Sequence, residues 1–100
     1  MARVEIAPEV LDDFDRIPEY QAHHKLAEGA ARVTEILLAI DVLAHSPLIG
    51  RPVSNGKRAL VVGRHARGFL ALYQYVEEID TVFVLAVRSQ REAGYARADL

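Results

Sequence analysis

Apolar residues recur at helical spacing in two stretches of the first half of the chain. After Pro8, which suits a first helical position because it lacks an N–H donor, one face collects Val10, Leu11, Phe14 and Ile17. Pro18 is expected to stop or kink this helix, and residues 19–28 fit either further helix or the bend of a hairpin. From Ala30 a second helix is predicted, ended by Ser46-Pro47, with an apolar stripe of Val33, Ile36, Leu37, Ile40 and Leu43.

Alternating and continuous apolar runs predict strands on either side of these helices. Residues 3–7 suit a short edge strand, with Val4 facing inward and Ile6 as a second candidate. Three further strands are expected at 59–62, 69–76 and 81–88, the last two joined by a hairpin loop at 77–80. Alternation puts Phe69, Ala71, Tyr73 and Tyr75 on one face, and sets Phe83, Leu85 and Val87 against Val82, Val84 and Ala86. The order β-α-α-β-β-β describes a single α+β domain spanning residues 1–100.

Composition narrows the class of protein further. In 100 residues, 12 lysines and arginines stand against 14 aspartates and glutamates, a formal charge of −2 that argues against a nucleic-acid coat protein. The absence of cysteine excludes disulfides, cysteine-ligated zinc and thiol catalysis. Because the adjacent His23 and His24 point to different helix faces, no metal site and no cofactor is expected. Without a long apolar run or a signal-peptide core, we expect a cytoplasmic protein that makes no membrane contact.

Charge is distributed unevenly along the chain. Residues 51–67 contain no carboxylate and five basic residues, so the local charge is +5. The five are Arg51, Lys57, Arg58, Arg64 and Arg67, and His65 lies in the same segment as a possible further positive charge. Such a segment can bind phosphate or an acidic partner even in a mildly acidic protein. The alternative is a pair of solvated loops whose positive charges balance the negative charges in the first half of the chain.

Four segments of the second half of the chain follow one another in a recognisable order: SPLIGRPV, KRALVVG, GFLALYQYV and TVFVLAVRSQREAGY. They include a Pro-x-x-Gly-Arg turn at Pro47, Gly50 and Arg51. In this order the segments resemble the RelE/ParE toxin superfamily, most closely its ParE-type, plasmid-stabilisation branch. The resemblance extends over about residues 3–96 and implies a small antiparallel twisted sheet of about four strands, with an N-terminal helical hairpin packed on one face.

The resemblance also implies which residues act. In the messenger-RNA-cleaving members, arginines on the sheet and a tyrosine or histidine near the C-terminus act on the scissile phosphate; the matching positions are Arg58, Arg88 and Tyr95. Guanidinium groups suit this role because they bind phosphate oxygens in a bidentate way. Residues expected to hold the target, an antitoxin or phosphate are Arg51, Lys57, Arg64, His65, Arg67 and Arg91. Each of these side chains also has a structural reading, as a strand-flanking or loop residue.

Three functions stay open at this point. The first is a type II toxin that arrests growth by acting on DNA gyrase and is neutralised by a cognate antitoxin. Such a toxin would bind operator DNA only through the antitoxin. The second is a ribosome-dependent messenger-RNA endonuclease, and the third a degenerate member that only binds its antitoxin. The net acidic charge and the absence of histidine from residues 89–100 weaken the nuclease and favour the gyrase reading.

Overall fold

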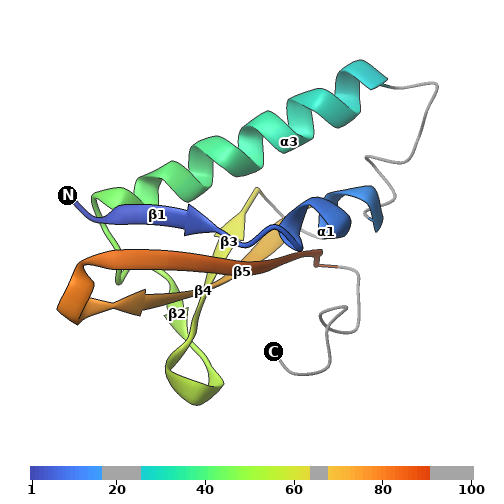
Figure 1. Ribbon diagram of the computed structural model, residues 1–100. Helices are drawn as coiled ribbons and strands as arrows, with labels where there is room; N and C mark the ends of the chain where they lie inside the picture. The colour runs from blue at the N-terminus through green and yellow to red at the C-terminus, as the bar shows by residue number, and fades with distance from the viewer. Residues whose placement is uncertain (17–25, 64–67, 91–100) are drawn as a thin grey trace.

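The computed structural model describes residues 1–16, 26–63 and 68–90, and these form a mixed α+β fold (Figure 1). The α-helices are α1 (Val10–Arg16) and α3 (Leu26–Asp41), and α3 continues as a 3₁₀ turn, η2 (Val42–Ala44). Two further 3₁₀ turns are η3 (Ser54–Gly56) and η5 (Glu77–Ile79). The strands are β1 (Arg3–Ile6), β2 (Arg51–Pro52), β3 (Arg58–Val62), β4 (Phe69–Val76) and β5 (Thr81–Ser89).

The strands form one sheet in the order β1-β5-β4-β3-β2. The pairs β3–β4 and β4–β5 are antiparallel, as predicted, and the α+β fold class is confirmed. Two details differ from the prediction: β1 pairs with β5 in parallel, and Arg51–Pro52, just after the predicted turn, form a short fifth strand antiparallel to β3. β1 lies at an edge, where Val4 packs against the core while Ile6 is 41% exposed.

One hydrophobic core lies between the sheet and the helices, which cover a single face of it (Figure 1). α3 supplies Ile36 and Ile40, and η2 adds Leu43, as the predicted stripe requires. Leu37 belongs to that predicted stripe but is 44% exposed, because it lies one residue, or about 100°, around the helix from Ile36. From α1 the core takes Val10 and Phe14, whereas Leu11 is largely exposed. Residues 17–25, including Ile17 and the predicted break at Pro18, lie outside the described residues.

β5 contains a bulge that changes which side chains reach the core. Along β4, Leu72 pairs with Ala86 and the next residue, Tyr73, pairs with Val84, so Leu85 is an extra residue in β5. Val82 and Val84 before the bulge and Val87 after it all lie in the core. The predicted strict alternation through 81–88 was therefore wrong beyond Val84.

No helix within the described parts of the chain is long and apolar enough to cross a membrane.

Candidate functional site

A basic groove lies on the face of the sheet that turns away from the helices, termed the far face. The groove has a volume of about 240 Å³, and its described lining includes three cationic side chains, Arg51, Lys57 and Arg88. Its uncharged lining residues are Val53, Ser54, Asn55, Ala59, Leu70 and Leu72. Among these, Ala59 and Leu72 are buried and form an apolar floor. A ligand with both an anionic group and an apolar part could pair with the cations and pack against the apolar floor.

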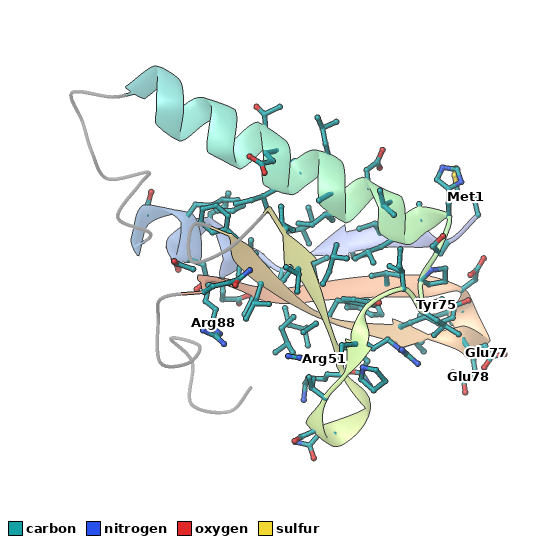
Figure 2. The ribbon with its side chains drawn as sticks, turned by 180° about the vertical axis from the view of Figure 1, so that it is seen from behind. Met1, Arg51, Tyr75, Glu77, Glu78 and Arg88 are labelled. Atoms are coloured by element: carbon teal, nitrogen blue, oxygen red, sulfur yellow. The ribbon has the colours of Figure 1, made fainter. Side chains whose placement is uncertain are left out.

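Strand pairing places the two arginines on this face. β4 residues of the core alternate with Leu70 and Leu72, which therefore face away from the helices. Arg88 pairs with Leu70, and Arg51 pairs with Ala59, itself the partner of Leu72. Figure 2 shows Arg51 and Arg88 extending on the side of the sheet away from α3. Within the groove Arg88 is anchored by its Nη1, which donates to the Ser89 carbonyl at 3.3 Å.

Arg58 lies on the opposite face from Arg88. It pairs with Tyr73, a core residue, so its side chain is directed to the helical side of the sheet. Its Nη1 donates to the carbonyls of Leu48 (3.1 Å) and Gly50 (2.8 Å), in the loop that follows η2. The structure thus uses Arg58 to hold this loop, and does not bring Arg58 and Arg88 to one surface.

The same loop is held by Tyr73. The Gly50 N–H donates to Tyr73 Oη at 2.8 Å in a buried bond. A Cβ added at Gly50 would meet Tyr73 Cε1 and Oη at 2.6 Å and the Ala59 carbonyl oxygen at 3.0 Å. The Gly-Arg pair of the turn motif therefore has a physical basis. Gly50 permits this close approach, and Arg51 then enters β2 facing the groove.

Gly50→Ala is expected to lower the free energy of unfolding by about 1–3 kcal/mol, because the added methyl group overpacks against a buried ring and a backbone carbonyl. Urea denaturation measures the change. Gly56→Ala is the control: nothing lies within 4 Å of its added Cβ, and only the positive φ of 73° is strained. Equal unfolding midpoints for Gly50→Ala and the wild type would contradict the packing account.

The buried Tyr73 hydroxyl is expected to make the free energy of unfolding fall at alkaline pH. Burial raises the pKa of Tyr73 above 10.0, against smaller lowering effects of the Gly50 N–H and the Arg58 charge. The folded state thus favours the protonated phenol, so this contribution is fully present below the unfolded pKa and is lost as pH rises through the folded pKa. Tyr73→Phe is expected to be less stable at neutral pH by about 1–3 kcal/mol and to show a smaller fall above pH 10.

Urea midpoints measured across that pH range test this expectation. The pKa of Tyr75 is also raised, chiefly by its hydrogen bond to Asp80, so Tyr75→Phe serves as a parallel control. Identical alkaline slopes in Tyr73→Phe and the wild type would contradict it.

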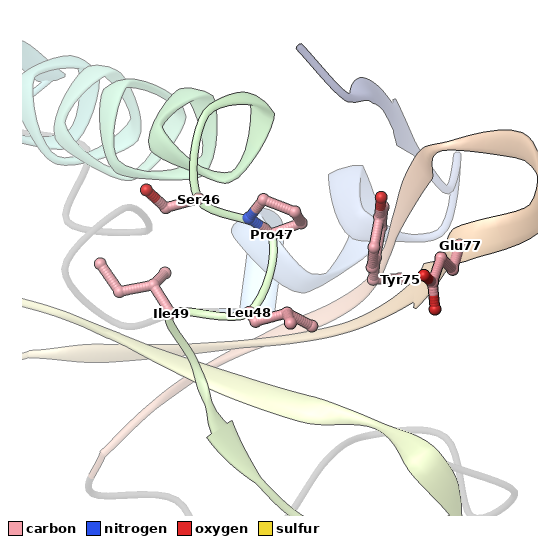
Figure 3. A pocket seen from close by; sticks show the side chains of 6 residues that line it. All are labelled: Ser46, Pro47, Leu48, Ile49, Tyr75 and Glu77. Carbon is pink, nitrogen blue, oxygen red and sulfur yellow. The ribbon is translucent and has the colours of Figure 1, made fainter.

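A second, mainly apolar hollow of about 420 Å³ lies at the other end of the sheet (Figure 3). Its lining comprises Ser46, Pro47, Leu48, Ile49, Tyr75 and Glu77. Leu48 and Ile49 are more than half exposed there, on the loop held by Arg58 and Tyr73. The described lining residues include one carboxylate and no cation, so this part of the hollow does not suit the anion expected of the groove.

The remaining residues predicted from the sequence lie outside the described residues: Arg64, His65, Arg67, Arg91 and Tyr95. Of the predicted residues that are described, Arg51, Lys57 and Arg88 meet in the groove. Sequence reasoning missed Ser54 and Asn55, which line it from η3. The Asn55-Gly56 pair was the available signal, because both residues adopt positive φ in a tight turn. The described residues contain no group of three or more histidines and carboxylates that could hold a metal ion.

A protein-family model described as the ParE toxin of the type II toxin-antitoxin system parDE matches residues 4–94. The chain belongs to this family. It is therefore a toxin of a type II toxin-antitoxin system, and the resemblance predicted from its sequence is confirmed. No curated protein sequence matches this toxin.

Two solved structures show the same fold as the toxin. The toxin-antitoxin complex RelBE2 from Mycobacterium tuberculosis matches with a TM-score of 0.57 and 23% identity, over 88% of this chain and 96% of that one. A double mutant of the E. coli toxin RelE in the free state matches with a TM-score of 0.55 and 15% identity, over 93% and 88% of the respective chains. At these identities the likeness establishes the shared architecture alone.

Proposed function

We propose that this toxin arrests growth by binding its target through the far-face groove, that the target is DNA gyrase, and that a cognate antitoxin silences it. The observation that carries the proposal is the chemistry of the groove. Arg51, Lys57 and Arg88 supply positive charge, and Ala59 and Leu72 supply an apolar floor. These groups suit recognition of an acidic surface on a protein.

Catalysis would need more than the described residues of this groove offer. Cutting RNA at a ribose 2′-hydroxyl requires a group that takes a proton and a group that gives one. Among the described residues that line the groove there is no histidine, tyrosine or carboxylate. Arg58, one member of the predicted catalytic set, is engaged with the Leu48 and Gly50 carbonyls on the other face. This supports binding over cleavage.

The antitoxin is proposed to cover the same groove with an acidic segment. The M. tuberculosis neighbour is a toxin in complex with its antitoxin, and three clustered cations fit a carboxylate-rich, partly disordered arm that orders on binding. Neutralisation of Arg51 and Arg88 in the complex would block the target site directly. The reading frame next to the toxin gene is expected to encode this protein, with a DNA-binding part and a charged tail.

Inducing the toxin alone, with and without its neighbouring gene, tests the function. The proposal expects growth arrest, rescue by the neighbour, trapped cleaved DNA in gyrase supercoiling assays, and intact messenger RNA. Tyr95→Phe separates the two toxic mechanisms, because a binding toxin keeps its activity without that hydroxyl. In-frame messenger-RNA cuts that disappear in Tyr95→Phe and Arg88→Ala would establish the endonuclease instead, and normal growth would identify a member that binds antitoxin only.

A further inference from the structure

A carboxylate from α1 completes the hydrogen bonding of β5 where β1 stops. β1 pairs with β5 from Thr81 to Val84, and the Ala7 N–H donates to the Val84 carbonyl at 2.9 Å. Three residues further along β5, the Val87 N–H donates to Asp13 Oδ2 at 3.0 Å, in a buried bond. The side chain of Asp13 thus accepts a backbone N–H that the short neighbouring strand cannot reach.

The burial of the Asp13 carboxylate is unusual for a charged side chain. Its side chain is 1% exposed, whereas its acidic neighbours Asp12 and Asp15 on the same helix are exposed. Taking a carboxylate out of water carries a large penalty unless hydrogen bonds replace the lost hydration. An apolar residue would fill the same position without that penalty but could not accept the Val87 N–H. The buried carboxylate therefore points to a need for an acceptor at this point of β5.

The Val87 N–H that Asp13 accepts lies in the part of β5 where the bulge changes the face on which the side chains lie. Regular alternation after the core residue Val84 would turn Arg88 toward the helices, four positions later on the same face. The extra residue at Leu85 shifts the alternation, so that Val87 enters the core and Arg88 lines the groove. Asp13 holds the residue immediately before Arg88, on the distal side of this bulge.

We propose that Asp13 is a positioning residue for the groove: its carboxylate fixes the bulged segment of β5 and thereby keeps Arg88 on the far face. The inference rests on the proposed function of the groove, but it concerns a residue that lies on the opposite, helix-covered side. Asp13 acts through Val87 and does not touch the bound anion. One cation of the groove, Arg88, is thus oriented from inside the core.

Four variants of the full-length toxin test this role. Asp13→Ala removes the acceptor, and Asp13→Asn keeps a side-chain oxygen of the same reach. Val10→Ala loosens the packing of the same helix but leaves the acceptor of the Val87 N–H in place, and Asp15→Ala removes an exposed carboxylate nearby. Three measurements are made on folded protein: calorimetric binding of inorganic pyrophosphate, hydrogen exchange of the Val87 amide, and the rate at which phenylglyoxal modifies Arg88.

Asp13→Ala is expected to weaken pyrophosphate binding about tenfold, since a misplaced charge loses most of its bidentate contact. Val87 exchange should accelerate and Arg88 reactivity should change in that variant only. Asp13→Asn, Val10→Ala and Asp15→Ala should stay within about threefold of the wild-type affinity. Equal affinities in Asp13→Ala and Val10→Ala, with unchanged Val87 exchange, would overturn the inference. So would a loss in Asp13→Asn as large as in Asp13→Ala.

A separate outcome would count against the proposed function instead. If the wild-type toxin does not bind pyrophosphate, the groove is not the anion site proposed for it. The Val87 exchange and Arg88 reactivity still decide the role of Asp13 in that case. A change confined to Asp13→Ala supports it, and no change overturns it.

Discussion

Arg88→Glu is expected to abolish growth arrest while leaving the protein folded. Arg88 lies on the far face and lines the groove beside Arg51 and Lys57, so the substitution removes one of three positive charges and places a negative charge among the other two. Truncating or reversing one member of a desolvated charge cluster at an interface typically costs about 2–5 kcal/mol of binding. The expected loss of target affinity is therefore about 30-fold or more, on the order of several thousand-fold at the upper end. Growth after induction and circular dichroism of the purified variant measure toxicity and folding.

Arg3→Glu is the matched charge reversal for this test. Arg3 lies on the edge strand β1, its side chain is 77% exposed, and its Nε contacts Glu5 Oε1 at 2.7 Å. A surface ion pair of this kind contributes little to stability, so the variant should arrest growth as the wild type does. Equal loss of toxicity in both variants would show that overall charge matters rather than the groove. Full toxicity of a folded Arg88→Glu protein would remove the groove from the mechanism.

Ile40→Ala is expected to destabilise the fold strongly. Ile40 lies on α3, is 2% exposed, and belongs to the core between the helices and the sheet. Truncation of such a side chain removes buried apolar surface and leaves a cavity, at a cost of about 2–5 kcal/mol. For a domain with a total stability of about 5–15 kcal/mol, this is a large fraction. Thermal and urea unfolding followed by circular dichroism measure it.

Leu38→Ala provides the comparison on the same helix. Its side chain is 66% exposed, so the same kind of truncation should change the free energy of unfolding by less than about 0.5 kcal/mol. Comparable losses in Ile40→Ala and Leu38→Ala would mean that α3 does not pack on the sheet through the face that carries Ile40.

The regular elements could be predicted from the sequence because short-range patterns determine them. β4 occupies residues 69–76 as alternation predicted, and Ile36, Ile40 and Leu43 face the core as helical spacing required. What could not be predicted depends on contacts between distant residues. The parallel pairing of β1 follows from the path of the whole chain, and nothing in a run of valines and leucines marks Leu85 as the extra residue of a bulge.

The candidate site was predicted in part for the same reason. The excess of basic residues after Gly50 indicated an anion site, and Arg51, Lys57 and Arg88 do meet in one groove. The face on which each arginine lies depends on strand register, which composition does not reveal. Arg58 opens β3, and its pairing with Tyr73 directs it to the loop carbonyls rather than to Arg88.

β5 lies inside the sheet although it follows all the other described strands in the chain. β1 pairs with β5, with Arg3 opposite Thr81. Asp13 can accept its backbone hydrogen bond only once Val87 of β5 has been made. Contacts between such distant segments form late, because most of the chain must be made before the two ends can meet. Until β5 has been made, the nascent polypeptide thus lacks both a finished sheet and Arg88. The groove therefore assembles only after β5 has been synthesised, and the nascent toxin cannot bind a target through it before that point.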